Sequence, residues 1–144
     1  MRILVKNTLA LTPDGTRQAD IYIEDNRIVS LAGCPAGVQP EHTIDGAEKL
    51  CMPALVNSHT HAYMSLFRNY ADDRSFHEWL FERIMPLEDQ LTREDAYWGS
   101  MLSCIEMIRS GTGCFCDMHL FPCASAKAAE DTGLRAVVSR GLVG

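Results

Sequence analysis

Two histidines one residue apart, His59 and His61, are the pair in this sequence whose type and spacing best suit metal chemistry. They follow an apolar run, residues 51–56, that predicts a strand. Side chains at i and i+2 of a strand point to the same face, so both imidazoles would project together from the strand's carboxyl end. A catalytic zinc usually has three protein ligands and one open position, and imidazole is a common ligand. The pair therefore predicts half of a metal site, and the preceding strand favours this over two unrelated loop histidines.

Composition and charge exclude several classes of protein. The chain of 144 residues has a net charge of −6, with Lys and Arg scattered, which argues against a nucleic-acid-binding surface. No apolar stretch approaches the roughly 18 residues of a membrane span. The N-terminus, residues 1–6, has no signal-peptide pattern, so we expect a cytoplasmic protein with reduced cysteines and with neither nucleic acid nor membrane as a partner.

The elements that must position the histidines fall into two groups. Residues 1–50 predict a small antiparallel β unit, with strands separated by turns at Pro13–Gly15 and at Asp25–Asn26. The expected strands cover residues 3–5, 9–11, 21–23 and 28–31. Residues 33–48 lack periodicity and predict a connection without a strand.

Residues 51–144 predict alternating strands and helices. A capping box at Ser75–Glu78 would open one helix, which Pro86 should close, and a second helix would run from Thr92 to Gly111. The remaining elements are strands at 113–118 and 134–140 and a helix at 125–132. This rhythm is typical of a parallel α/β sheet, whose ligands bind at the carboxyl ends of the strands, where the histidines lie.

The motifs together resemble a known family. The stretches that carry the resemblance are residues 52–61, 67–68, 76–80, 86–89 and 113–118. They are similar to the amidohydrolase superfamily and, within it, to the methylthioadenosine and S-adenosylhomocysteine deaminases, in the branch that also holds the triazine chlorohydrolases. The His-x-His pair alone is a superfamily feature, and its combination with Trp79 and Glu88 is more specific.

The resemblance implies a (β/α)8 barrel with one divalent metal ion, zinc or alternatively iron, and a β-sandwich built from both chain ends. Residues 1–50 would then be part of the sandwich, and residues 51–144 the first three strands of the barrel. His59 and His61 would be metal ligands. Two further histidines, an aspartate and a proton-shuttling glutamate would come from later strands, so we expect this N-terminal part alone to be inactive and to require the remainder. The family often forms homo-oligomers.

The resemblance also implies residues that bind substrate. Trp79 would line the pocket, although a core position is equally compatible with an aromatic on an amphipathic helix. Glu88 would accept hydrogen bonds from ribose hydroxyls, against the alternative of a solvated carboxylate. Arg140 would face the amino-acid carboxylate of homocysteine. From the sequence, Asp117 and His119 are expected to be structural.

The predicted function is hydrolytic deamination of an adenosine-derived thioether by a metal-activated water. The predicted partner is thus a small molecule, a purine nucleoside or a related heterocycle. The alternatives are a chlorohydrolase, a guanine- or cytosine-type aminohydrolase, or a non-catalytic fragment without the other ligands. Hydantoinase-like relatives usually carry an aspartate where this chain has Asn57, which disfavours them.

Overall fold

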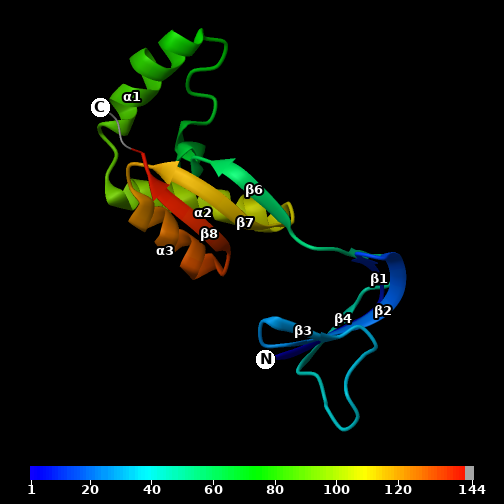
Figure 1. Cartoon of the computed structure of the whole chain (residues 1–144). Helices are drawn as coiled ribbons and strands as arrows, with labels where there is room; N and C mark the ends of the chain where they lie inside the picture. Colours follow the sequence, from blue (N-terminus) through cyan, green and yellow to red (C-terminus); the bar gives the residue numbers. More distant parts are fainter. Residues whose placement is uncertain (142–144) are drawn as a thin grey trace. The chain divides into compact units, whose positions relative to one another are not determined.

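The computed structural model describes residues 1–141 and divides into two compact units, Met1–Pro53 and Ala54–Gly144 (Figure 1). The assignment of residues 1–50 to a sandwich and 51–144 to a barrel stays a prediction, and residues 142–144 lie outside the described part. No helix among the described residues is long and apolar enough to cross a bilayer.

The first unit is a mixed five-stranded sheet. Its strands are β1 (Arg2–Thr12), β2 (Gly15–Glu24), β3 (Arg27–Ser30), β4 (His42–Asp45) and β5 (Leu50–Cys51). The order is β3-β2-β1-β4, with β5 also paired to β1. The predicted turn before Gly15 joins β1 and β2, which are antiparallel. However, β4 and β5 run parallel to β1, so the expectation of a purely antiparallel unit is wrong.

The prediction missed β4 because its side chains carry no pattern. All four residues of β4 are exposed, and its place in the sheet rests on backbone pairing with β1, which the sequence does not display. The expectation that residues 33–48 contain no strand is therefore wrong. The two short strands expected at 3–5 and 9–11 are one strand, whose pairing with β2 shifts register between Val5 and Thr8. Asn7 has a φ of 58° there, and such a bulge breaks the alternation of side chains.

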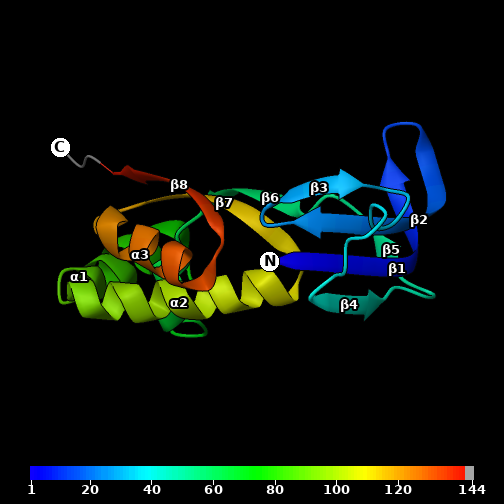
Figure 2. The same cartoon turned by 90° about the horizontal axis from the view of Figure 1, so that it is seen from below.

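The second unit is a parallel α/β layer, as predicted. Its strands are β6 (Leu55–Thr60), β7 (Thr112–His119) and β8 (Arg135–Arg140), in the order β6-β7-β8. The longer helices α2 (Arg93–Arg109) and α3 (Pro122–Thr132) cover one side of this sheet (Figure 2). Shorter helical segments are η1 (Ala62–Phe67), η2 (Glu78–Ile84) and α1 (Met85–Glu88).

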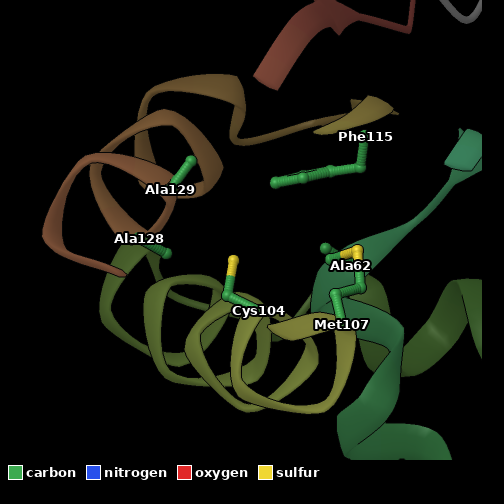
Figure 3. Close-up of a cluster of buried hydrophobic side chains, with 6 residues drawn as sticks. All are labelled: Ala62, Cys104, Met107, Phe115, Ala128 and Ala129. Carbon is green, nitrogen blue, oxygen red and sulfur yellow. The ribbon is translucent and has the colours of Figure 1, made fainter. Parts of the chain in front are cut away.

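The core of this unit lies between the sheet and the two helices. Phe115 of β7 is fully buried and points into the space beside α2 and α3 (Figure 3). Small side chains on α3 allow the close packing of the helix on Phe115. The other buried members of the cluster are Ala62, Cys104, Met107, Ala128 and Ala129. Burial of a phenylalanine stabilises a fold by about 1.5–3 kcal/mol.

β6 begins at Leu55, four residues later than the predicted strand start at residue 51. Pro53 has no N–H to donate, and Cys51 instead pairs with Ala10 in the first unit. His59 therefore lies within β6, and His61 follows its last residue directly.

The helical segment after η1 begins as predicted and ends differently. The backbone N–H and hydroxyl of Ser75 donate to the carboxylate of Glu78, and Glu78 N–H donates back to Ser75 Oγ, which is the predicted capping box. Pro86 does not close the helix, because α1 continues to Glu88. The preceding turns are π-helical, with Met85 N–H bonded to the carbonyl of Leu80 five residues back, and this wider winding accommodates a residue that lacks an N–H.

α2 begins and ends where the sequence predicts. Thr92 is its N-cap and forms a reciprocal capping box with Asp95. Gly111, with a φ of 86°, follows the C-cap residue Ser110. Glycine adopts this left-handed conformation without steric cost, which explains why the helix ends there.

Gly99 of α2 is required by a close approach to η1. A Cβ at this position would lie 2.6 Å from the carbonyl oxygen of Tyr63 and 2.8 Å from Leu66 Cγ. We predict that Gly99→Ala lowers the free energy of unfolding by about 1–3 kcal/mol, measured by chemical denaturation, because the helices must separate. Arg93→Ala, on the exposed face of the same helix, is the control and should change it by less than about 0.5 kcal/mol. Equal effects of the two variants would contradict the close packing.

Candidate metal centre and substrate pocket

The two histidines lie together at the carboxyl end of β6. Their ring centroids are 5.1 Å apart and the ring planes are nearly perpendicular, at 85°. Both rings line a hollow of about 220 Å³ whose other walls include Asp117 and Met118 of β7 and Ser139 of β8. Two imidazoles that bind one zinc tetrahedrally at about 2.0–2.1 Å have centroids about 5 Å apart. The spacing therefore fits two ligands of a single ion.

A backbone carbonyl fixes the orientation of His61. Its Nδ1 lies 2.6 Å from the carbonyl oxygen of Met118. A carbonyl only accepts hydrogen bonds, so Nδ1 carries the hydrogen and donates it. The lone pair is then on Nε2, as is usual for a histidine that binds a metal through one nitrogen and a supporting acceptor through the other.

His59 and His61 do not form a complete metal centre by themselves. Among residues 1–141 there is no cluster of three or more His, Cys, Asp or Glu side chains that could hold an ion. The histidine pair thus fits a divalent ion of the zinc type as part of a ligand set.

Asp117 of β7 forms a hydrogen bond with the backbone of the segment that follows His61. One carboxylate oxygen accepts a hydrogen bond from the backbone N–H of Ala62, at 2.9 Å, and the other accepts one from Ser125 Oγ at the start of α3, at 2.5 Å. His119 Nε2 lies 3.4 Å from this second oxygen. Since His119 Nδ1 accepts a hydrogen bond from Phe121 N–H, the ring hydrogen is on Nε2 and faces Asp117.

These contacts control the charge of Asp117. Burial raises the pKa of this carboxyl, but the close contact with His119 and the hydrogen bonds from Ser125 and the Ala62 N–H outweigh burial and hold the pKa below its ordinary value. Asp117 therefore contributes stability at neutral pH that is lost as the pH falls through its pKa. The predicted structural role of Asp117 agrees with this geometry. The sequence did not identify its partner Ser125, because that hydrogen bond links two elements.

A second hollow, of about 320 Å³, lies next to the first. Its walls include His61, Trp79, Glu88, Met118 and His119. Trp79 is half-buried and lies in this wall, and its contact with substrate stays a prediction. Trp79 and Glu88, two of the three residues predicted to bind substrate, are thus brought together beside His61.

Glu88 is partly withdrawn from water in this hollow. Burial raises the pKa of its carboxyl above the ordinary value, and the electrostatic effect of the neighbouring His61 and His119 rings acts in the opposite direction without cancelling it. A carboxyl with a raised pKa beside a metal-ligand candidate is typical of a functional site.

Arg140, the third residue predicted to bind substrate, is not brought into either hollow. It is the last residue of β8, is exposed, and is paired in register with His119. Val137 and Ser139 line the histidine hollow. Because side chains alternate along a strand, Arg140 lies on the other face of β8 from these two residues. Its role stays a prediction.

Comparison with known proteins assigns the chain to a family. Residues 50–144 match the sequence model of the amidohydrolase family. The chain is 47% identical to 5-methylthioadenosine/S-adenosylhomocysteine deaminase 1 of Archaeoglobus fulgidus over 137 residues, which cover 95% of the chain and 32% of that relative. It is also 47% identical to a 5'-deoxyadenosine deaminase of Methanosarcina mazei over 98% of its length and 33% of the relative. The chain belongs to the amidohydrolase family, and it spans about a third of the length of these curated relatives.

Solved structures show the same fold. An adenosine deaminase from Xanthomonas campestris with bound zinc superposes with a TM-score of 0.84 at 26% identity, over 94% of this chain and 33% of that one. An atrazine chlorohydrolase from Arthrobacter aurescens complexed with zinc gives a TM-score of 0.81 at 22% identity, over 96% and 35%. The predicted superfamily and α/β class are therefore confirmed.

The Asp117 contacts make a prediction about metal binding. In the protein expressed from the complete reading frame that contains these residues, Asp117→Asn should weaken zinc binding about tenfold or more, because an amide nitrogen would face the donors Ser125 and His119. Chelator competition measures the affinity. Thr132→Val, which removes another side-chain hydrogen bond from α3, is the control and should lower the melting temperature without changing zinc affinity. Equal zinc affinity in wild type and Asp117→Asn would contradict this role.

Proposed function

We propose that this chain provides the first three strands of a (β/α)8 barrel in a metal-dependent deaminase, and that residues 1–50 belong to a β-sandwich. Three parallel strands with helices on one side are consistent with part of such a barrel, which has eight parallel strands when complete. Val56 and Val137 are 65% and 62% exposed on these strands, as expected where further strands complete the sheet. The remaining ligands, two histidines and an aspartate, and a proton-shuttling glutamate would come from the portion of the relatives that this chain does not span.

His59 and His61 would bind one divalent ion, zinc or alternatively iron. A bound ion of this kind lowers the pKa of a coordinated water to about 7 and so supplies a nucleophile at neutral pH. Two groups of β7 hold His61 in place. The backbone carbonyl of Met118 fixes its ring, and the carboxylate of Asp117 fixes the backbone directly after it.

The observation that carries the proposal is the position of His61 between the two hollows. It lines the hollow of the histidine pair and also the one that contains Trp79 and Glu88. A substrate bound against Trp79 would therefore present its reacting carbon near the metal. Trp79 would contact the purine base, and the two oxygens of Glu88 would accept hydrogen bonds from the ribose hydroxyls.

The reaction that fits this arrangement is hydrolytic deamination. The oxygen of a water molecule replaces the amino group on the purine ring, and the amino nitrogen leaves as ammonia. The relatives are named for methylthioadenosine, S-adenosylhomocysteine and 5'-deoxyadenosine, which share the adenosine-derived part that Trp79 and Glu88 would bind. Among these substrates only S-adenosylhomocysteine carries an amino-acid carboxylate, which Arg140 would bind. A chlorohydrolase or a guanine- or cytosine-type aminohydrolase is the alternative, and Glu88 favours a nucleoside over these ring substrates. A cytoplasmic location and the absence of nucleic-acid and membrane partners stay predictions.

The direct test is an assay of ammonia release. The protein from the complete reading frame, loaded with zinc, should deaminate methylthioadenosine or S-adenosylhomocysteine with kcat/KM at least about a hundredfold above that for guanine, cytosine or a chlorotriazine. His61→Ala should abolish turnover and reduce the zinc content. Turnover of a triazine in preference to the nucleosides would overturn the substrate assignment. No turnover and no tight zinc binding would favour the non-catalytic alternative.

The raised pKa of Glu88 predicts a pH dependence of substrate binding. As the pH falls through this pKa, the carboxylate gains a proton and loses acceptor capacity, so KM for the nucleoside should rise. Because the pKa is raised, this increase in KM should begin at a higher pH than it would for a glutamate with an ordinary pKa. Steady-state kinetics between about pH 4 and 8 measure the effect. Glu88→Gln should raise KM and remove this part of the pH profile. Glu82→Gln, an exposed residue of η2, is the control and should leave both unchanged. An unaltered pH profile in Glu88→Gln would contradict the assignment.

A further inference from the structure

One irregular helical stretch, residues 76–88, forms much of the wall of the second hollow. The side chains that it contributes are those of Phe76, Trp79, Leu80, Ile84 and Glu88. An α-helical hydrogen bond opens the stretch, from Trp79 N–H to the carbonyl of Ser75, and another closes it, from Asp89 N–H to the carbonyl of Met85. Between them η2 is π-helical, and Met85 N–H bonds to the carbonyl of Leu80, five positions back. Such π-helical stretches inside α-helices are frequent at functional sites.

The π-helical winding decides which side chains share a face of this stretch. In a regular α-helix each residue turns the chain by about 100°, so Trp79 and Glu88 would lie on opposite sides of the axis. In a π-helix the hydrogen bond spans one more residue, and each residue turns the chain by only about 85°. With this winding up to Met85 and α-helical winding after it, Trp79 and Glu88 lie about 90° apart. The wider winding therefore explains why both side chains line one hollow.

Pro86, directly after the π-helical turns, opposes a regular α-helix here. It has no N–H for the carbonyl of Glu82, its α-helical partner four positions back, and its ring would collide with that carbonyl. Where the hydrogen bonds span five positions, as at Met85, this partner is not required. Pro86 is exposed and is not among the described residues that line the hollow. Any effect of Pro86 on a bound molecule must therefore act through the winding.

We propose that Pro86 is a positioning residue for substrate binding. It holds residues 78–84 in the π-helical winding, and this winding directs Glu88 into the hollow beside Trp79. The inference rests on the proposed function, in which Glu88 accepts hydrogen bonds from the ribose hydroxyls. Without the proline the stretch is free to wind as an α-helix, which turns Glu88 by about 90° relative to Trp79. The carboxylate then leaves the ribose, whereas the histidine pair of β6 keeps its place.

Replacement of the proline tests this role. In the zinc-loaded protein from the complete reading frame, Pro86→Ala should raise KM for methylthioadenosine about tenfold or more, because hydrogen bonds to a charged acceptor are lost. For the analogue without the 2'- and 3'-hydroxyls, which cannot use Glu88, kcat/KM should stay within about threefold of wild type. The melting temperature should not fall, because alanine is favoured over proline inside a helix. Pro122→Ala is the control and should leave KM unchanged, since a proline is tolerated in the first turn of α3.

A crystal structure of Pro86→Ala shows the winding directly. We expect Met85 N–H bonded to the carbonyl of Phe81 and the Glu88 carboxylate outside the hollow. An unchanged π-helical winding, or an unchanged KM for methylthioadenosine, overturns the proposal. Equal losses of kcat/KM on both substrates also overturn it, because they indicate a general defect of the fold. Failure of the proposed function is a distinct result, in which the wild-type protein does not deaminate methylthioadenosine and the crystal structure alone decides whether Pro86 sets the winding.

Discussion

The position of the histidine pair depends on the hydrogen bond from the Ala62 N–H to the buried carboxylate of Asp117. The regular pairing between β6 and β7 cannot supply this constraint, because the register shifts between Asn57 and Thr60, the stretch that contains His59. Such irregularities re-aim side chains at functional sites, but they also remove ladder hydrogen bonds that would hold the strand end. Asp117 and the carbonyl of Met118 replace them with two contacts directly after the break, to the Ala62 N–H and to the ring of His61.

The same constraint connects the site to the packing of the unit. Ser125 donates to Asp117 from the first turn of α3, so the helix that covers the sheet also supports the carboxylate. On the other side, Ser103 of α2 donates to the carbonyl of Ala62, at 2.6 Å. The residue after His61 is thus held through its N–H by β7 and through its carbonyl by α2. Buried polar networks of this kind are costly when one member is lost, which links the position of His61 to the integrity of the core.

Features that depend on residues close together in the sequence could be predicted from the sequence alone. The His-x-His pair, the capping box at Ser75 and the helix start at Thr92 are local patterns. The structure confirms the box and the helix start, and both histidine rings line one hollow. The parallel α/β order also followed from periodicity. The strand β4 could not be predicted, because only backbone pairing places it.

The start of β6 and the continuation of the helix through Pro86 were predicted wrongly for a related reason. Cys51 is apolar, like the strand residues after it. Its pairing with β1, far away in the sequence, cannot be predicted from the residues next to it. Pro86 closes an α-helix but not the π-helical winding that precedes it here. The support of Asp117 by Ser125 likewise joins residues of different elements, and only the fold brings them together.

In the proposed metal site, the end of β6 holds one metal ion through His59 and through Nε2 of His61. Anomalous diffraction from crystals of the zinc-loaded protein, produced from the complete reading frame, tests it directly. We expect a single strong peak about 2.0–2.1 Å from one nitrogen of each ring, with His61 Nδ1 still directed at the Met118 carbonyl. A peak that lies elsewhere in the protein, or a zinc ion bound through His61 Nδ1, would contradict it.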